Sequence, residues 1–388
     1  MRVSFDEVFE IMRNNISSTK DYLTIDVRDS HGHISYEEII NPNNIPSFNK
    51  SPFDGYAIKV GYENYVVKGV IYAGDTNNYS INDNTCYKIM TGAMLPENTE
   101  MLIKKEDVEE SSESIKPLIP LKKDLNIIFE GEDLKKGEII LNCGTYIDAY
   151  TQAVLISSGI KSIKVIKKPK ILIFSTGTEL LEPGDDLIKG KIFNSNTHFI
   201  KSKLQEWGLE STIANNIEDD YEKIKDFIKQ STEEFDLIIS TGAMSVGDKD
   251  YIPMILDDLK AEIYFLRSKV KPGGNFALSK YNDSYLFTLS GNPFSSMAMI
   301  ETVLKTFFYQ LTDSSHFRLK KVLAEINEPI ENNLEQHRIY RGVYKEGIFY
   351  KSKNQNSGSL SEFLVANAMI ILPPKSVIKD KSEIILIK

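Results

Sequence analysis

Apolar residues recur at different spacings along the chain, and each change of spacing predicts a different kind of unit. Over residues 4–14 they recur every three to four positions, which predicts an amphipathic helix with Ser4 and Glu7 as its capping box. Residues 45–128 contain short β-like runs separated by glycine, asparagine and proline, the pattern of a separate small β-rich domain. Residues 131–168 then return to a mixture of strand and helix patterns. We therefore expect the β-rich block to be inserted into a domain formed by both of its flanks.

Strand and helix patterns alternate through residues 170–311. The predicted strands are Lys170–Ser175, Ser211–Asn215, Asp236–Ser240, Glu262–Leu266 and Tyr285–Leu289. The predicted helices are Thr197–Trp207, Asp220–Gln230, Ile252–Asp258 and Ser295–Leu311. This alternation predicts a central, doubly wound, mostly parallel sheet that is covered by helices on both faces.

The remaining residues, 313–388, return to short strands separated by polar turns, the pattern of a small β-barrel or sandwich. The fold class that follows is multidomain α/β plus β. We expect four domains: a discontinuous linker domain (1–44 and 129–168), the inserted β-rich domain (45–128), the α/β domain (169–312) and a C-terminal β-barrel (313–388).

Composition narrows the range of functions. The net charge of −9 argues against a nucleic-acid binder, which needs a basic face. The two cysteines, Cys86 and Cys143, show no metal-binding spacing and indicate a reducing compartment. The start of the chain predicts an amphipathic helix rather than a signal peptide, and no apolar run approaches the ~20 residues of a membrane span. We expect a soluble cytoplasmic protein with no membrane contact.

Three apolar runs in the α/β region end in a small-residue turn of the type Ser/Thr-Gly. They lie within Ile171–Leu180, Asp236–Tyr251 and Tyr285–Pro293. Open α/β sheets bind anionic ligands at the carboxyl ends of their strands, where backbone N–H groups can approach a phosphate-like group. The alternative is that each turn only connects a strand to a helix, as such turns do in any α/β protein.

Carboxylates accompany these strand ends. Glu179, Asp219, Asp248 and Asp250 each follow a predicted strand, and paired carboxylates with substrate phosphates are a common Mg²⁺ site. Individually, a carboxylate at such a position is more often a helix cap or a surface charge.

The cations of this region gather after the fourth predicted strand, at Arg267, Lys269, Lys271 and Lys280. Lys271 precedes a Pro-Gly-Gly turn with accessible N–H groups, which suits an oxyanion. An edge hairpin protected by lysines is the alternative interpretation. From the residues alone, the α/β domain is expected to bind a phosphate-bearing small molecule together with a divalent metal.

Nine segments, taken together and in this order, resemble one known family. They are SPFDGYA (51–57), MTGAMLPE (90–97), GEDLKKGE (131–138), STGTELLEPGD (175–185), FNSN (193–196), STGAMSVGDKDY (240–251), KVKPGGNFA (269–277), LSGNPFSS (289–296) and RGVY (341–344). On these segments the chain resembles the MoeA family of molybdopterin molybdenumtransferases, which the C-terminal part of gephyrin also represents. The resemblance extends over nearly the whole chain.

The resemblance implies an elongated homodimer. Each active cleft would be built from the α/β and C-terminal domains of one subunit and the inserted domain of the other. The implied reaction inserts molybdate into the dithiolene of adenylyl-molybdopterin with Mg²⁺ and release of AMP. A molybdopterin adenylyltransferase is an implied partner. An adenylyltransferase-type relative, or a molybdopterin-binding scaffold without metal insertion, is the alternative function.

The resemblance also implies roles for individual residues. The catalytic, metal-binding carboxylates of the α/β domain would be Glu179, Asp219 and Asp250. The pterin and its phosphate would be held by Gly242, Ser245, Arg267, Lys271, Gly291, Asn292, Pro293 and Ser295. The molybdate side would be lined by Arg341 and Ser357. The remaining functional positions, which lie in or beside the inserted domain, would be Asp54, Thr91 and Asp133.

The chain departs from the family's pattern where anions would bind. Ala243 stands where the family has a second glycine, and Gly274 stands where it has a lysine. Arg267 replaces another expected lysine, Ser290 replaces a proline, and Phe53 replaces a methionine. Arginine binds anions as a planar fork rather than as a point charge, so that exchange is not neutral. These departures bear on anion binding more than on the fold.

Overall fold

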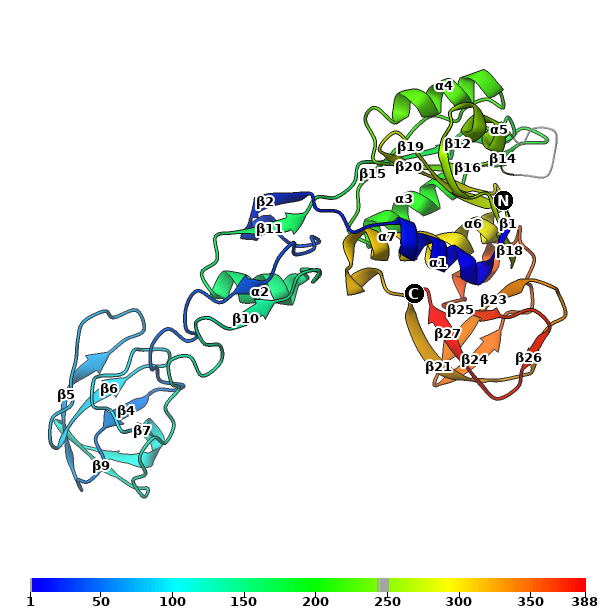
Figure 1. Ribbon diagram of the computed structural model, residues 1–388. Coiled ribbons are helices and arrows are strands. Elements are labelled where there is room, and N and C mark those ends of the chain that lie inside the picture. Colours follow the sequence, from blue (N-terminus) through cyan, green and yellow to red (C-terminus); the bar gives the residue numbers. More distant parts are fainter. Residues whose placement is uncertain (1, 243, 245–250) are drawn as a thin grey trace.

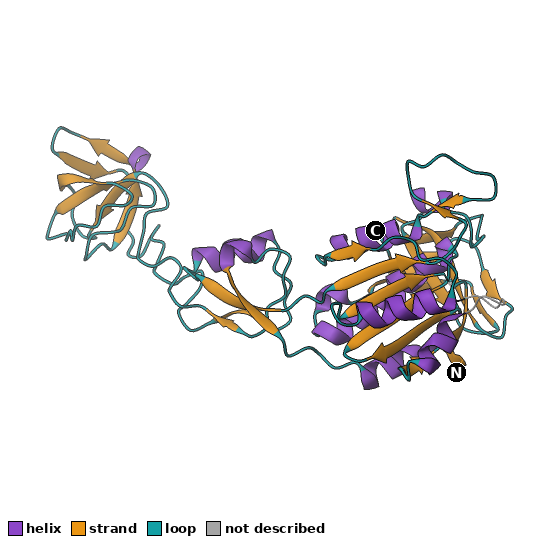
Figure 2. Cartoon of the chain, turned by 90° about the horizontal axis from the view of Figure 1, so that it is seen from above, coloured by secondary structure: helices purple, strands orange, loops and turns teal. Residues whose placement is uncertain are grey.

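The computed structural model describes residues 2–242, 244 and 251–388 of the 388-residue chain. The molecule is elongated. The β-rich inserted domain lies at one end, a slender linker lies in the middle, and the α/β domain with the C-terminal barrel lies at the other end (Figures 1 and 2). Within the described ranges, no helix combines the length and apolar character that crossing a membrane requires.

The inserted domain is a six-stranded sheet in the order β7-β4-β6-β5-β9-β8. Its strands are β4 (Gly55–Ile58), β5 (Tyr65–Ile71), β6 (Thr85–Ile89), β7 (Met101–Lys104), β8 (Val108–Glu110) and β9 (Ser114–Pro117). Neighbouring strands are antiparallel except for β5 and β6, which run parallel. Each face of the sheet packs a separate apolar cluster, so this part of the chain has its own core.

The chain passes through the linker on both sides of the inserted domain. The linker consists of β2 (Tyr22–Asp26) paired with β11 (Ser162–Ile166), β3 (Ile39–Ile40) paired with β10 (Ile139–Leu141), and the helix α2 (Ala149–Ser157). Both strand pairs join a segment before the insertion to one after it, and both are antiparallel. The linker is therefore discontinuous in sequence and continuous in space.

The α/β domain contains a six-stranded sheet in the order β15-β12-β16-β20-β19-β17. Its strands are β12 (Ile171–Ser175), β15 (Ser211–Ile213), β16 (Leu237–Thr241), β17 (Glu262–Phe265), β19 (Phe276–Tyr281) and β20 (Ser284–Leu289). The first four strands in the spatial order run parallel, and β19 is antiparallel to both of its neighbours. The predicted mostly parallel sheet is confirmed, but β19 was missed because its short apolar run follows a glycine turn with no helix between them.

Helices cover both faces of this sheet, as a doubly wound fold requires. They are α3 (Asn196–Glu206), α4 (Tyr221–Ser231), α5 (Tyr251–Asp258), α6 (Pro293–Met299) and α7 (Lys305–Thr312), with a π-helical turn, η3 (Ile300–Leu304), between the last two. Successive side chains of the central strands point to opposite faces of the sheet, so they belong alternately to two hydrophobic cores. One face of the sheet packs on α3, α6 and α7, and the other on α4 and α5.

The C-terminal domain is a five-stranded barrel. Its strands are β21 (Lys320–Ile326), β23 (His337–Lys345), β24 (Ile348–Lys351), β25 (Ala368–Leu372) and β27 (Lys381–Leu386). The barrel closes because β23 pairs with both β24 and β25. A further two-stranded sheet, β22 (Ile330–Asn332) with β26 (Ser376–Ile378), lies beside it.

The N-terminal segment joins the α/β domain to the barrel. The strand β1 (Arg2–Ser4) pairs with β18 (Arg267–Lys271), and β18 pairs in turn with β23 of the barrel. The helix α1 (Phe5–Asn15) begins at the predicted capping box, because Ser4 accepts from the Glu7 N–H and Glu7 accepts from the Ser4 N–H. Its buried side chains belong to the core of the α/β domain. The first residues of the chain therefore pack on the α/β domain and not on β2 and β11 of the linker.

A buried ion pair fixes α6–α7 against α3. Lys203 Nζ lies 2.8 Å from Glu301 Oε1, and both side chains are almost fully buried. Lys203 also contacts the carboxylate of Glu206, which is mostly exposed, at 2.6 Å. The single tryptophan, Trp207, packs beside the Lys203 ammonium. Its fluorescence should therefore report unfolding of this domain.

We predict that Lys203→Met lowers the free energy of unfolding by about 3–5 kcal/mol, because it leaves the Glu301 carboxylate buried without its main partner. Glu206→Gln should cost less than about 1 kcal/mol, since that carboxylate is largely solvated. Urea unfolding followed by Trp207 fluorescence measures both variants. Equal losses would show that the buried pair contributes no more than the exposed one.

Candidate active site

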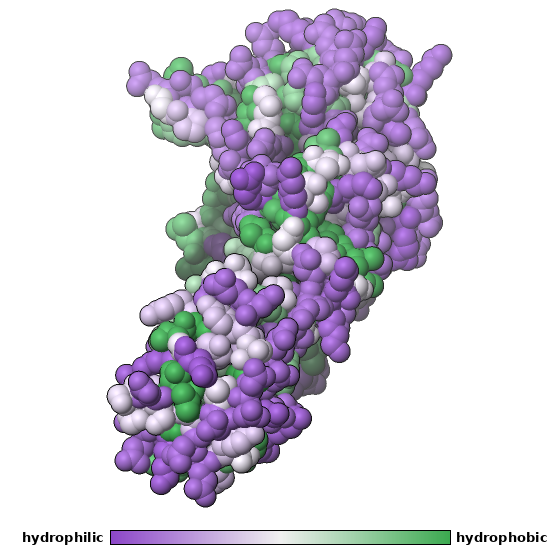
Figure 3. All heavy atoms as spheres, turned by 90° about the vertical axis from the view of Figure 1, so that its left-hand side faces the viewer, coloured by the Kyte–Doolittle hydropathy of each residue, from purple (hydrophilic) through white to green (hydrophobic). Residues whose placement is uncertain are grey.

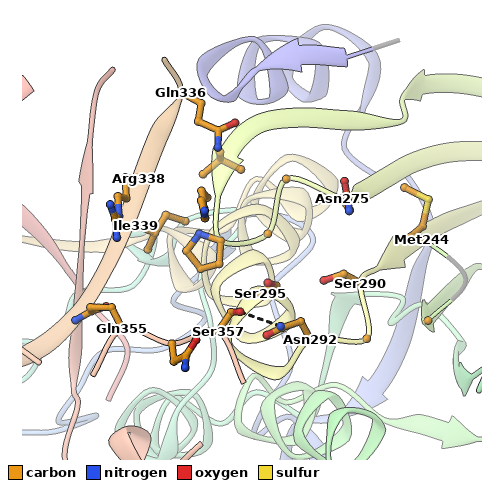
Figure 4. Close-up of a pocket in the computed structure, with 18 of the residues that line it drawn as sticks. Met244, Asn275, Ser290, Asn292, Ser295, Gln336, Arg338, Ile339, Gln355 and Ser357 are labelled. Carbon is orange, nitrogen blue, oxygen red and sulfur yellow. Dashed lines mark hydrogen bonds between the residues drawn. The ribbon is translucent and has the colours of Figure 1, made fainter. Parts of the chain in front are cut away.

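A cavity of about 1300 Å³ lies between the α/β domain and the C-terminal barrel. Its lining comes from the loops after β12, β16 and β20, from the turn between β18 and β19, and from the barrel (Figure 4). The three Ser/Thr-Gly strand ends that the sequence singled out therefore converge, and Glu179, Gly242 and Gly291 all line this one cavity.

The strand ends pack backbone to backbone, and at Gly242 this packing requires glycine. Gly242 has a φ of +95°, and a Cβ there would lie 2.5 Å from the carbonyl oxygen of Thr176. Gly291 faces Gly242 directly, since a Cβ on Gly291 would lie 4.0 Å from the Gly242 Cα. The Gly242 N–H donates to the carbonyl oxygen of Leu289. The two loops thus meet backbone to backbone, which leaves room for a ligand above them.

Glu179 stands on a similar turn after β12. Gly177 has a φ of +140°, and a Cβ there would lie 2.7 Å from Glu179 Oε2, so the carboxylate folds back over the glycine. The Gly177 carbonyl oxygen accepts a hydrogen bond of 2.8 Å from Asn216 Nδ2, and Asn216 also contacts Ser175 Oγ. The segment that carries Asp219 begins just after Asn216. These contacts hold the Glu179 turn and the Asp219 loop beside each other at the cavity.

The loop before α6 is fixed from three sides. Asn196 Nδ2 donates to the Gly291 carbonyl oxygen at 2.8 Å. Asn292, the N-cap of α6, donates to Ser357 Oγ at 2.9 Å, the hydrogen bond drawn in Figure 4. The Phe294 N–H donates to the Ser357 carbonyl oxygen at 3.0 Å. Ser357 therefore ties the barrel to the first turn of α6, where Ser295 also lines the cavity.

Arg341 lies beneath this junction and not on the cavity wall. Its side chain is fully buried, and its guanidinium donates to the carbonyl oxygens of Asn354, Asn356 and Ser359. The guanidinium carbon lies 4.3 Å from the centre of the Phe294 ring. Burial lowers the pKa of Arg341. Arg341 is not part of the described lining, because these contacts direct its charge into the loop that carries Ser357, and its predicted role beside the molybdate stays a prediction.

The cavity collects positive charge on an acidic chain. Its described lining contains four cations (Arg2, Lys271, Arg338 and Lys353) and two carboxylates (Glu179 and Asp219), an excess of two positive charges against a chain total of −9. Of the four cations, only Lys271 was singled out from the sequence. The other three come from the N-terminus and the barrel, and no local motif marks them as neighbours of the strand ends.

Part of the expected acidic cluster lies outside the described residues. This holds for Asp250 and Ser245, and for Asp248 beside them. Within the described ranges, no group of three or more His, Cys, Asp or Glu side chains could hold a metal ion. Glu179 and Asp219 nevertheless line the same cavity, so the structure brings together the two described members of the predicted metal site.

Three of the expected residues lie far from the cavity in the same chain. Asp54 and Thr91 belong to the inserted domain at the other end of the molecule (Figure 1). Asp54 Oδ1 accepts from both the N–H and the hydroxyl of Thr91 at 2.8 Å, and these hydrogen bonds, the backbone one first, lower the pKa of Asp54. Asp133 is exposed in the chain that leaves the inserted domain. None of the three lines the described cavity.

Two further predicted binding residues lie beside the cavity without lining it. Arg267 is in β18, paired with Arg2 of β1, and Pro293 is the first residue of α6. Neither belongs to the described lining. Their predicted roles in binding, like those of the lining residues, stay predictions.

Comparison with known proteins agrees with the fold and the cavity. Residues 3–159 match the model of the MoeA N-terminal region (domain I and II), and residues 172–310 match a probable molybdopterin binding domain. A molybdopterin molybdenumtransferase from Staphylococcus epidermidis is 33% identical over 364 residues, with 90% of this chain and 87% of that protein covered. One from Staphylococcus aureus is 34% identical over 372 residues, with 92% and 89% covered.

A solved structure of the same family matches the fold of the whole chain. The crystal structure of a molybdopterin biosynthesis MoeA protein from Pyrococcus horikoshii OT3 superimposes with a TM-score of 0.83 at 26% identity and covers 100% of both chains. Sequence and architecture thus agree from the linker to the barrel, and the chain belongs to the MoeA family of molybdopterin molybdenumtransferases.

Proposed function

We propose that this protein is a molybdopterin molybdenumtransferase of molybdenum cofactor biosynthesis. It inserts molybdate into the dithiolene of adenylylated molybdopterin and releases AMP. The observation that carries the proposal is the single cavity in which three glycine-containing strand ends meet four cations and two carboxylates. Both substrates are anions, and an acidic chain must concentrate its positive charge where it binds them.

The residues of the cavity suit the two parts of the substrate. The Gly242 and Gly291 turns, with Ser295 in the first turn of α6, offer short polar groups and backbone to the phosphate and pterin. Lys271, beside them, neutralises phosphate charge. Ser357 and the barrel loop adjoin the first turn of α6 and extend the lining beyond it, which suits a second anion, the molybdate. Holding both anions in one cavity places the metal oxyanion beside the dithiolene.

Mg²⁺ is the proposed metal, held by Glu179 and Asp219 on the described side of the site. The chemistry of these donors fits, since Mg²⁺ takes oxygen ligands and usually binds one or two carboxylates together with substrate phosphates. When bound, the ion would withdraw charge from the phosphoanhydride whose cleavage releases AMP. The two carboxylates hold the ion and orient the nucleotide. Asp250 is a third proposed ligand.

We propose a homodimer, because Asp54 and Thr91 can act at a cavity only if a second copy supplies them. Their hydrogen bonds already fix the Asp54 carboxylate in an exposed position. Apolar side chains on the surface supply material for an interface. Several of these side chains belong to the linker, where Tyr150 is 85% exposed and Ile40 is 57% exposed. Figure 3 shows such apolar groups on an otherwise polar face.

The proposed setting is the cytoplasm, with a molybdopterin adenylyltransferase as the partner that supplies the adenylylated substrate. Both cysteines are free thiols, in keeping with a reducing compartment. We expect the purified protein to release AMP from adenylylated molybdopterin with Mg²⁺ and molybdate, and to yield active cofactor. Product only from unadenylylated molybdopterin with ATP would indicate an adenylyltransferase, and binding without AMP release would indicate a scaffold.

We predict that Glu179→Gln and Asp219→Asn each lower AMP release by at least about 100-fold and raise the Mg²⁺ concentration needed for half-maximal rate. The physical reason is the loss of a charged oxygen ligand. Glu218→Gln is the matched control, because Glu218 is the neighbour of Asp219 but pairs with Lys223 at the surface. Titrating Mg²⁺ at fixed substrate measures all three variants. An unchanged Mg²⁺ requirement in the first two would remove them from the metal site.

We predict that mixing inactive Asp54→Ala and Glu179→Ala subunits restores turnover. Each heterodimer would contain one intact site and one doubly altered site, so it should reach about half of the wild-type rate. Glu179→Ala mixed with Asp219→Ala is the control, since both changes fall in the same domain and every site stays defective. Differently tagged subunits allow the heterodimers to be purified. Heterodimers of the first pair that stay inactive would contradict the shared site.

A further inference from the structure

The turn between β18 and β19 has no room for a side chain at Gly274. A Cβ there would lie 2.6 Å from the carbonyl oxygen of Val270 and 2.7 Å from that of Ser268. Both obstacles are backbone atoms, and the Ser268 N–H donates to the Gly274 carbonyl oxygen at 2.9 Å, which holds the turn closed. No cation can therefore project into the cavity from this position.

A lysine stands on the barrel side of the same cavity. Lys353 follows β24 and lines the cavity together with Asn354, Gln355 and Ser357. Gln355 Nε2 donates at 2.8 Å both to the Ser352 carbonyl oxygen and to the Arg341 carbonyl oxygen. The Ser352 N–H also donates to the Arg341 carbonyl oxygen, so residues on both sides of Lys353 are bonded to β23. These bonds fix the backbone position of Lys353 at the cavity.

The other cations brought by the tertiary structure already have partners. Arg2 donates to Gln336 Oε1 at 3.1 Å, and the Arg338 guanidinium lies 4.7 Å from the centre of the Tyr340 ring. In the part of the chain that the structure describes, the Lys353 ammonium has no ion pair, hydrogen bond or aromatic contact. Its charge is available to an anion. Lys271, in β18, is the only other lining lysine among the described residues.

We propose that Lys353 is an oxyanion-binding residue, which supplies from the barrel the positive charge that the turn at Gly274 cannot carry. It acts with Lys271, so that an anion in the cavity is bound by two lysines from different segments of the chain. This inference deepens the proposed function and rests on it, since the anion at this site would be the molybdate or the substrate phosphate.

The test compares Lys353→Met with Lys351→Met in the full-length protein. Lys351 is two residues earlier, and its ammonium lies 5.4 Å from the centre of the Tyr340 ring instead of lining the cavity. Calorimetric titration with molybdate, at low and at higher salt, should give a dissociation constant about tenfold weaker for Lys353→Met, because a charge-assisted contact is lost. Lys351→Met should bind as the wild type does, and Lys353→Arg should retain part of the affinity.

The outcomes separate the two proposals. Unchanged molybdate binding in Lys353→Met, beside an active wild type, overturns the inference and leaves the proposed function intact. A wild type that binds molybdate through Lys353 but never releases AMP supports the inference and overturns the proposed function. A wild type that does not bind molybdate overturns the inference as well.

A second pair of variants tests whether position 274 can accept a side chain. Gly274→Lys added to Lys353→Met should not restore molybdate binding, and Gly274→Ala alone should lower the thermal midpoint, because a Cβ meets two carbonyl oxygens. Restored affinity with an unchanged midpoint would show that the turn can accept a side chain. In that case position 274 could itself carry a cation, and Lys353 would not be needed to replace it.

Discussion

The contact between the first turn of α6 and the barrel loop that carries Ser357 is the constraint on which the site depends. Asn292 and the Phe294 N–H both bond to Ser357, while the buried Arg341 guanidinium holds the loop from below and stacks on Phe294. The guanidinium donates to three carbonyl oxygens of this loop, which ties the loop to β23. These contacts join the two domains at the edge of the cavity.

This junction explains why the lining is assembled from so many parts of the chain. The α/β domain alone contributes a typical anion site, with strand-end glycines and two carboxylates. The barrel adds a second wall and two further cations, Arg338 and Lys353, and the strand β1 adds Arg2. An isolated α/β domain could hold a phosphorylated pterin in this way. The second wall is what makes room for another anion beside it.

The distance between the inserted domain and the cavity bears on how the site is completed. The linker holds Asp54 and Thr91 at the far end of the molecule, and its two antiparallel strand pairs give it a defined shape of its own. Such a separation makes little sense for residues of one site in a single chain. It is the geometry expected if each subunit completes the site of its neighbour, and the exposed apolar residues of the linker are consistent with that arrangement.

Local patterns in the sequence determined the elements and their type: the capping box at Ser4, the alternation of strands and helices, the three strand-end glycines and the short strands of the barrel. These follow from side-chain periodicity and backbone conformation, which act over a few residues. Only the tertiary structure decided that β1 joins β18, that Arg341 turns into the protein, and that Lys353 reaches the cavity. The contact between Arg2 and Gln336 spans 334 positions, and no local preference encodes such a pairing. It arises because β18 pairs with β1 on one side and with β23 on the other, which brings Arg2 close to the residue that precedes β23.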